Sequence, residues 1–498
     1  MTDTPEVPEG LRPANENPWY ILMTLYGEQE GENIDWELHE KNRRAWNAWA
    51  GQALSVEERA AAAESSEIEV AELDGWEALA EEIKTRFKAQ YRRRNPEADN
   101  VPDLPDPKDQ IEMSETAFSN GVVLEKAVYA SIARFTSATF TQNAVFESAT
   151  FMQSAFFASA TFTQTAQFTS ATFTRNVLFD SATFTQAALF DLATFTQNAL
   201  FDSATFTQTA SFAKAAFTQY AWFSSATFMQ DAWFVSASFT QDAWFASVTF
   251  SGFADFTETR FEGARENPCI PNFTECQFEK PTTFRQALFL DGYPEFAGAV
   301  LHDKTSFTAR MKPTSDEIAR AKDLKGQTYW PKTTKQNPVN ARESCATIRH
   351  VLTKQGLPEE AHFFFRREMH FAGLPSEGRT WAERLPYRLF GWFSDYGYSI
   401  QRPLWWLAGV WFVGLLTFAY LFAVPQDYPK LAKYDDWTAM GLSFSNLFPL
   451  FGFSRMFLSD VLKDLPRGAQ FLSGTQTVLS LPLLFFLGLG LRQRFRLR

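Results

Sequence analysis

Phenylalanine recurs through residues 135–261 at a fixed spacing. The steps between successive phenylalanines alternate between five and six residues from Phe135 to Phe261, so the pattern has a strict period of eleven. Nearly every phenylalanine follows a small residue, usually alanine, by two positions, and the positions between carry Thr, Ser, Gln, Asn and Asp. The stretch from Phe179 to Phe184, FDSATF, contains both features.

An α-helix cannot bury this pattern. An 11-residue period is typical of a right-handed coiled coil, but at about 100° per residue the two phenylalanines of one repeat fall on roughly opposite sides of a helix. No single apolar stripe results, and Thr and Phe favour strands over helices. In a strand, alanine at i−2 and phenylalanine at i point to the same side. The additional residue in every second unit then marks a corner, so the pattern predicts a β-solenoid.

Units of the form A-x-F-x-x, with phenylalanine at the centre, resemble those of the pentapeptide-repeat proteins. The spacing F-x-x-A-T-F-x-x-x-A-x-F is similar to their variant with a sixth residue in alternate units. The resemblance implies a mainly β fold, a right-handed quadrilateral β-helix with 22 residues per coil. The register extends back to Phe118 and, after a break at 265–271, forward to Phe307. We therefore expect a solenoid of about nine coils over residues 111–311.

The segments on either side of the solenoid are expected to be helical. Residues 1–110 should form an N-terminal cap with a disordered start over 1–18, which is rich in Pro and Glu, and helices at 34–50 and 55–93. The end of a solenoid exposes unpaired backbone groups and needs a cover. Residues 312–400 should form a second helical linker and cap.

The segment 401–498 carries two uncharged apolar runs long enough to cross a bilayer. These runs are 404–424 and 469–491. A third segment, 437–454, is uncharged but contains several polar residues, so it is marginal as a span and fits a re-entrant or interfacial helix better. We therefore predict two crossings.

The charged residues beside these runs predict their orientation. Arg384, Arg388 and Arg402 precede the first run, and four arginines between 492 and 498 follow the second. By the positive-inside rule, both ends lie in the cytoplasm. The N-terminus has no basic, apolar signal peptide, so it should be cytoplasmic too.

Residues 340–498 are similar to the C-terminal region that often follows these repeats in bacterial membrane proteins. The segment Ser394–Pro403 and the closing LRQRFR carry this likeness. The resemblance implies a multi-pass protein of the bacterial inner, or plasma, membrane, with the N-terminal region, the β-helix and the C-terminus in the cytoplasm. It implies no biochemical activity.

Composition and motifs argue against several function classes. The formal net charge is −12, which argues against a nucleic-acid-binding surface. Cys269, Cys276 and Cys345 have no metal-ligand spacing, and three cysteines give no disulfide framework. The sequence contains no phosphate-cradling glycine motif, nucleophile elbow or His/Cys metal constellation. We expect a non-enzymatic protein with no catalytic residue, cofactor or metal site.

Two sets of solenoid residues are candidates for an interaction surface. Asp180 and Asp202 lie two repeats apart and should stack on one face. Such a ladder could bind cations or a basic partner, although solvated carboxylates more often keep a rod soluble. Trp222 and Trp244 should also stack on one face, with Trp233 opposite. Exposed tryptophans indicate a contact surface or packing beneath the C-terminal helices.

The membrane segment contains uncharged polar residues of a different kind. Polar groups inside a bilayer usually face a pore or a helix bundle, and hydrogen bonding between helices is the alternative to a pore. The candidates are Ser443, Asn446, Thr475, Gln476 and Ser480.

The sequence favours a membrane-anchored protein-interaction module over two alternatives. An oligomeric two-helix channel is the first, although the signature TVGYG is absent. A DNA mimic that inhibits a topoisomerase is the second, but residues 135–260 carry only eight acidic and three basic residues, far below the charge density of DNA. The expected partners are the lipid bilayer and an unidentified protein. A homo-oligomer is left open.

Overall fold

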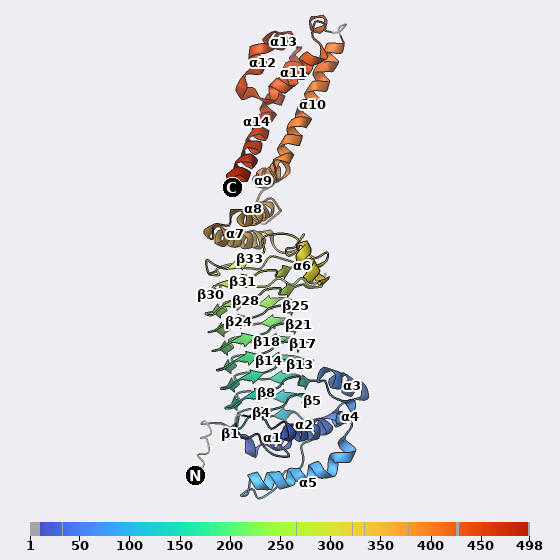
Figure 1. The fold of residues 1–498 in the computed structure, drawn as a ribbon, viewed down its shortest axis with the longest axis vertical. Helices are drawn as coiled ribbons and strands as arrows, with labels where there is room; N and C mark the ends of the chain where they lie inside the picture. The colour runs from blue at the N-terminus through green and yellow to red at the C-terminus, as the bar shows by residue number, and fades with distance from the viewer. Residues whose placement is uncertain are drawn as a thin grey trace. The chain divides into compact units, whose positions relative to one another are not determined.

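The computed structural model describes residues 10–31, 33–264, 266–320, 322–332, 334–376, 378–424 and 428–496. The chain divides into two compact units, Met1–Ala361 and His362–Arg498. The first contains a solenoid with a helical segment at each end, and the second is built of helices (Figure 1). Part of the disordered start predicted for residues 1–18, namely residues 1–9, lies outside the described residues, as does Arg265 in the predicted break.

The strands of the described residues form four parallel sheets, which are the four faces of the solenoid. Face 1 contains β1 (Arg12–Pro13), β3 (Thr116–Phe118), β7 (Thr139–Phe140), β11 (Thr161–Phe162), β15 (Thr183–Phe184), β19 (Thr205–Phe206), β23 (Thr227–Phe228), β27 (Thr249–Phe250) and β30 (Gln277–Phe278). Face 2 contains β4 (Val122–Val123), β8 (Ala144–Val145), β12 (Ala166–Gln167), β16 (Ala188–Leu189), β20 (Ala210–Ser211), β24 (Ala232–Trp233), β28 (Ala254–Asp255), β31 (Thr282–Phe284) and β33 (Ser306–Phe307). Face 3 contains β5 (Val128–Tyr129), β9 (Thr150–Phe151), β13 (Thr172–Phe173), β17 (Thr194–Phe195), β21 (Ala216–Phe217), β25 (Ser238–Phe239), β29 (Arg260–Phe261) and β32 (Leu288–Phe289). Face 4 contains β2 (Ile111–Glu112), β6 (Ala133–Arg134), β10 (Ala155–Phe156), β14 (Val177–Leu178), β18 (Ala199–Leu200), β22 (Ala221–Trp222) and β26 (Ala243–Trp244).

The register of these sheets confirms the expected length of the coil. Phe162 pairs with Phe184, which in turn pairs with Phe206, so each coil takes up two repeats. The phenylalanines of the repeat and the alanines two positions before them are buried. Because each coil visits the four faces in turn, strands that are one repeat apart lie on opposite faces.

The corners of the coil are of two kinds, which explains the alternation of five and six residues. After faces 2 and 4 the chain makes a tight turn, as where the Ala182 N–H donates to the Phe179 carbonyl over 3.0 Å. Ser181, the third residue of that turn, has φ 56°, as a type II turn requires. After faces 1 and 3 a wider bend holds the additional residue. There a threonine hydroxyl bonds to the coil before, as Thr207 does to the Phe184 carbonyl over 3.1 Å.

One coil is longer than the others. Phe250 pairs with Phe278, and Phe261 with Phe289, so this coil is six residues longer than a regular one. The described residues 263–264 and 266–271 form a loop at this place, where the sequence predicted a break in the register at 265–271. Gly263 is required in this loop, because a Cβ atom there would lie 2.2 Å from the Asn267 carbonyl oxygen.

The N-terminal segment covers the first coil with helices and one strand. Its helices are α1 (Pro18–Met23), α2 (Trp36–Ala50), α3 (Val56–Ser65), α4 (Val70–Leu73) and α5 (Trp76–Arg94), with the short 3-10 helices η1 (Ala14–Glu16) and η2 (Gly51–Ala53). The backbone of β5 is satisfied by α2. Asn47 accepts from the Val128 N–H over 2.8 Å and donates to the Lys126 carbonyl over 3.1 Å, while the Trp46 indole donates to the Val128 carbonyl.

The start of the described chain departs from the sequence prediction. Residues 10–18 belong to the predicted disordered start, but Arg12–Pro13 forms β1 and extends face 1 by pairing with Thr116 and Ala117. The backbone N–H of Arg12 donates to the Glu115 carbonyl over 2.8 Å. Backbone pairing with a solenoid edge orders this segment, and composition does not reveal such pairing.

The other end of the solenoid is covered by α6 (Ser315–Arg320), η3 (Lys322–Leu324), a loop that contains Tyr329 and Trp330, and α7 (Pro338–Lys354). Trp330 continues the column of stacked rings, with its centroid 4.9 Å from that of Phe289. Its indole donates to the Thr308 carbonyl. Gln336 bonds to both the N–H and the carbonyl of Tyr293 at 2.9 Å each. Side chains thus satisfy backbone groups that no further coil pairs.

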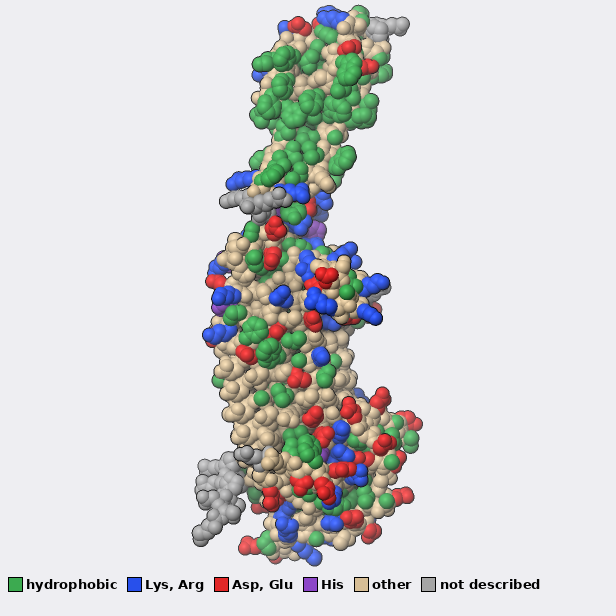
Figure 2. Space-filling model, viewed as in Figure 1, with side chains coloured by type: hydrophobic (Ala, Val, Ile, Leu, Met, Phe, Trp, Pro, Cys, Tyr) green, Lys and Arg blue, Asp and Glu red, His purple; other side chains and the backbone are tan. Residues whose placement is uncertain are grey.

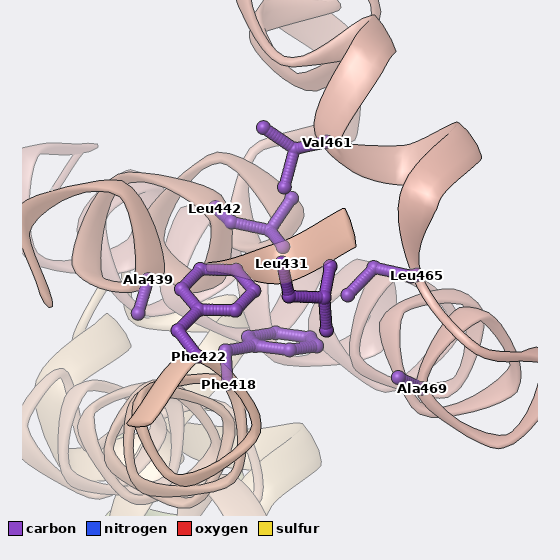
Figure 3. Close-up of a cluster of buried hydrophobic side chains, with 8 residues drawn as sticks. All are labelled: Phe418, Phe422, Leu431, Ala439, Leu442, Val461, Leu465 and Ala469. Carbon is purple, nitrogen blue, oxygen red and sulfur yellow. The ribbon is translucent and has the colours of Figure 1, made fainter. Parts of the chain in front are cut away.

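The second unit begins within α8 (Pro358–Ala372) and continues through α9 (Trp381–Ser394), α10 (Gln401–Ala423), η4 (Pro429–Leu431), α11 (Asp436–Leu447), η5 (Pro449–Phe451), α12 (Phe453–Phe457), α13 (Ser459–Asp464) and α14 (Arg467–Arg496). The long helices α10 and α14 are antiparallel. The end of α14, at Gly490, lies against Ser399 and Ile400 just before α10. Its beginning, at Ala469, joins a buried apolar cluster with the end of α10, at Phe418 and Phe422 (Figure 3).

Helix α11 lies between α10 and α14 and packs against both. It starts in the cluster of Figure 3, through Ala439 and Leu442, and ends at Leu447 beside Leu407 and Leu483. The chain then returns through α12 and α13, which places Val461 and Leu465 in the same cluster as the start of α11.

Candidate functional site

The acidic candidates of the solenoid are part of its corners. Asp180 and Asp202 follow buried phenylalanines at the tight turn between faces 4 and 1. Burial and the neighbouring Asp202 carboxylate raise the pKa of Asp180, and burial raises the pKa of Asp202. The Oδ1 atom of Asp202 accepts from the Ser224 N–H over 2.7 Å. These carboxylates lie near each other, and Asp202 links one coil to the next.

The same structural use of aspartate occurs at other corners. Asp191, on the opposite side of the solenoid, accepts from the Ala213 N–H over 3.0 Å. Asp231 accepts from the Phe253 N–H over 3.0 Å. Among the described residues, no group of three or more His, Cys, Asp or Glu side chains could hold a metal ion.

The three candidate tryptophans lie on two faces. Trp222 and Trp244 pair in adjacent strands of face 4, whereas Trp233 lies on face 2, beside the Phe253 ring at 5.9 Å. Trp244 is 37% exposed, and Trp222 and Trp233 are partly buried. The Tyr220 ring stacks on Trp222 with 5.5 Å between centroids.

A recess of about 260 Å³ lies beside Trp244. Tyr220, Asp242 and Trp244 line it from two adjacent coils, and Ile270 and Glu295 line it from the coils that follow. The loop of the long coil forms one wall of this recess. Sequence reasoning missed Tyr220, Asp242 and Glu295, although the two-repeat interval between Tyr220 and Asp242 could have placed them together.

The polar candidates of the second unit lie close together between three helices. Gln476 of α14 donates to the Val410 carbonyl of α10 over 2.8 Å and to the Ser443 hydroxyl of α11 over 2.9 Å. Asn446 donates to the Gln476 side chain over 3.0 Å. Ser480 lies at the Asn446 carbonyl, 3.4 Å away. These four side chains are buried.

Helix α10 provides room for this cluster at Gly414. A Cβ atom there would lie 1.9 Å from the Gln476 side-chain nitrogen and 2.5 Å from the Ser443 hydroxyl. Thr475, the remaining candidate, is not part of the cluster. It is partly buried, and its hydroxyl donates to the Phe471 carbonyl of its own helix over 2.9 Å.

Comparison with known proteins bears on the solenoid. The family model described as pentapeptide repeats (9 copies) matches residues 190–238, which lie in the most regular part of the four-faced coil. The solenoid is a pentapeptide-repeat domain. No curated protein and no solved structure matches the chain.

The pentapeptide-repeat domain gives each candidate a fixed place. Outward positions just before a phenylalanine recur on opposite faces, so Trp222, Trp233 and Trp244 alternate between faces 4 and 2. Positions just after the phenylalanines that end faces 2 and 4 fall in the tight corners, where aspartate can bond to backbone N–H groups, as Asp191 and Asp202 do. The repeat therefore arranges outward side chains in columns along the rod, and the column of Trp222 and Trp244 on face 4 ends beside the recess.

Proposed function

We propose that this protein is a membrane-anchored, non-enzymatic interaction module, in which the pentapeptide-repeat solenoid binds a protein partner at the cytoplasmic face of a bacterial inner membrane. One observation carries the membrane part. In the second unit, large apolar side chains are exposed while amide and hydroxyl side chains are buried. A water-soluble protein has the opposite distribution.

The exposed side chains of the long helices support this proposal. Phe412, Val413 and Leu416 of α10, and Val478 and Phe485 of α14, are each more than half exposed. Both helices are long and apolar enough to cross a membrane. Hydrophobic side chains cover most of the visible surface of this unit in Figure 2, and charged side chains gather near its two ends.

The antiparallel arrangement supports two crossings. Because the start of α10 lies at the end of α14, both outer ends of the pair would face the same side of a bilayer. Arg402 stands at this end, as do Arg492 and Arg494, which favours the cytoplasmic side. Helix α11 leaves the cluster of Figure 3 and the chain returns to that cluster, as a re-entrant segment would.

The construction of the solenoid supports a binding role. Capping segments satisfy backbone groups at both ends, as Asn47 and Gln336 do, which disfavours extension of the sheets by further copies. The interior is filled with stacked, buried phenylalanine rings. The four faces are therefore the surface on which partner recognition can occur, and solenoids use such extended surfaces for binding.

The two alternatives receive less support. A channel needs polar groups that face water, but Ser443, Asn446 and Gln476 bond to one another and to α10. A DNA mimic needs free carboxylates, but Asp191, Asp202 and several others accept backbone N–H groups.

Reporter fusions test the topology. Reporters at the N-terminus and the C-terminus should both be cytoplasmic, and a reporter inserted between α10 and α11 should lie on the other side. An external C-terminal reporter would require a third crossing by α11 and would contradict the proposal.

Photo-crosslinking in native membranes tests the interaction. Crosslinkers at outward positions of the four faces should capture one specific partner from one face. Purified protein in planar bilayers is the opposing test: unitary currents that Asn446→Leu with Gln476→Leu abolishes would favour the channel.

A further inference from the structure

The recess beside Trp244 differs from the rest of face 4 in its chemistry. Along this column the repeat places Phe156, Leu178 and Leu200, then Trp222 and Trp244. The column continues as Asn272 and Glu295 through isolated parallel bridges. Since successive strands lie about 4.8 Å apart, Glu295 stands about 10 Å along the rod from Trp244. An exposed indole and a carboxylate therefore flank one opening.

A second carboxylate and a second aromatic ring line the same recess. Asp242 occupies the repeat position of Tyr220, at the same corner of the next coil. Burial and the charge of Glu295 act to raise the pKa of Asp242, against the hydrogen bond from the Ile270 N–H. Both carboxylates line the same recess, so a cation bound there would interact favourably with both.

Neutral groups hold the two carboxylates in place. Asp242 accepts from the Ile270 N–H through Oδ1, over 3.0 Å. Glu295 accepts from Asn340 and Gln336 through Oε1, over 2.8 and 3.2 Å. These three donors are uncharged, so they orient the carboxylates without cancelling their charge. They engage Oδ1 of Asp242 and Oε1 of Glu295, and Oδ2 and Oε2 are the oxygens that would accept from a ligand.

The dimensions of the recess point to a single side chain as its occupant. Its volume of about 260 Å³ lies below the range of about 300–1,000 Å³ that is typical of small-molecule pockets. Tryptophan and tyrosine faces attract cations, most often the guanidinium group of arginine. Paired aromatic and carboxylate groups thus match an arginine in size, shape and charge.

We propose that this recess is the docking site for an arginine side chain of a protein partner, held between the aromatic rings of Tyr220 and Trp244 and the carboxylates of Asp242 and Glu295. This inference rests on the proposed function, because it assigns the partner-binding surface of the solenoid to face 4 and gives the partner a basic residue there.

Fluorine NMR on the full chain in lipid nanodiscs tests this site directly. 5-Fluorotryptophan replaces Trp244, and the probe is N-acetyl-arginine methylamide. The fluorine resonance of residue 244 should shift and reach saturation as the arginine compound is added. N-acetyl-citrulline methylamide, which has the same shape without the charge, should leave the resonance unchanged. Asp242→Asn should weaken binding about tenfold while keeping the hydrogen bond to Ile270. Equal responses to arginine and citrulline, or an unchanged affinity in Asp242→Asn, would overturn the site.

The opposite face supplies matched controls. Asp231 and Trp233 occupy the same repeat positions on face 2, and Asp231 accepts the Phe253 N–H as Asp242 accepts that of Ile270. Asp231→Asn should not change the affinity, and 5-fluorotryptophan at Trp233 should not respond. Trp244→Leu should fold, since leucine occupies this column at Leu200, and it should lose the arginine response.

Partner capture separates this inference from the proposed function. A partner crosslinked by the wild type and lost in Asp242→Asn with Trp244→Leu supports the site. Equal capture by both forms overturns the site and leaves the interaction module standing. A saturable arginine response without any captured partner supports the recess as an arginine site and counts against the interaction module.

Discussion

The rings of Phe179 and Phe201 are stacked, with centroids 5.0 Å apart and planes 7° apart, although the two residues belong to successive coils. Phe190, halfway between them in sequence, instead meets Phe179 edge-on at 81°. Stacking therefore runs along the columns and edge contacts run across the interior. Both arrangements suit the quadrupoles of aromatic rings, so phenylalanine can be used at every large interior position of the repeat, with alanine beside it.

The interior predicts a sharp difference between inward and outward positions. Phe190→Asp should unfold the solenoid, because an unpaired buried carboxylate costs more than about 5 kcal/mol, comparable with the whole stability of a domain. Leu189→Gln is the control, since Leu189 points outward and Gln167 precedes it in the same column. Chemical denaturation followed by circular dichroism measures both. A folded Phe190→Asp protein would contradict the packed core.

A strained corner predicts a stabilising substitution. Leu192 has φ 60° and is 52% exposed, whereas serine occupies most equivalent corners. A left-handed conformation is unfavourable for leucine and better tolerated by asparagine. Leu192→Asn should raise the free energy of unfolding by about 0.5–1 kcal/mol, a part of the cost of a left-handed conformation, measured by denaturant titration. Ser181→Asn should change it less, and a loss of stability in Leu192→Asn would contradict the argument.

The N-terminal cap predicts a large effect at Asn47. Its side chain satisfies the Val128 N–H and the Lys126 carbonyl of the first coil. Asn47→Leu should cost about 2–4 kcal/mol, because two buried backbone groups lose their partners. The exposed edge should also increase self-association, which light scattering detects. Gln52→Ala, in the same segment but on the surface, should have little effect on either measurement.

The C-terminal cap should lose stability in acid. Burial acts to raise the pKa of Glu317, but hydrogen bonds from Thr314, Gln286 and Arg310 outweigh it and lower the pKa to about 2. The folded state therefore favours the charged form, and this stabilisation is present above the ordinary value of 4.5 and is lost as the pH falls towards 2. Hydrogen exchange around Thr308 and Gln286 measures the opening of the cap.

Two comparisons test whether the loss of stability in acid comes from Glu317. Glu317→Gln should lower the stability at neutral pH and flatten its dependence between pH 4.5 and 2. The raised pKa values of Asp180 and Asp202 have the opposite sign, so their contribution favours the folded solenoid in acid. Equal acid sensitivity of cap and solenoid would contradict this assignment.

The polar cluster of the second unit predicts coupling between helices. Asn446→Leu and Gln476→Leu should each destabilise the unit, and their effects should be non-additive by about 0.5–1.5 kcal/mol, because the two side chains share a hydrogen bond. Unfolding of the two single variants and the double variant in bicelles measures this non-additivity as a double-mutant cycle. Gly414→Ala should destabilise by steric displacement of Gln476, and Thr475→Val, outside the cluster, should have little effect. Additive effects would contradict a shared bond.

The repeat itself was predictable from the sequence because it is local and strictly periodic. Alternating steps of five and six residues predicted the corners, and the small and aromatic positions predicted the interior of a solenoid. The coil of two repeats came from the resemblance to pentapeptide-repeat proteins, and the strand register confirms it. The long apolar runs of α10 and α14 were readable for the same reason, since length and composition suffice. The helices before the solenoid were also predictable, because helix-favouring composition and helix start signals are local features of the sequence.

Contacts between distant segments were decided only in three dimensions. No periodicity indicates that Arg12–Pro13 extends face 1, that Asn47 satisfies the backbone of the first coil, or that Trp330 continues the ring column. Nor does it indicate that Gln476 meets Asn446, 30 residues away. The recess beside Trp244 arises because a loop of irregular sequence stands next to a regular column. Side-chain hydrogen bonds depend on geometry that hydrophobic pattern does not encode, and only the folded chain brings these groups together.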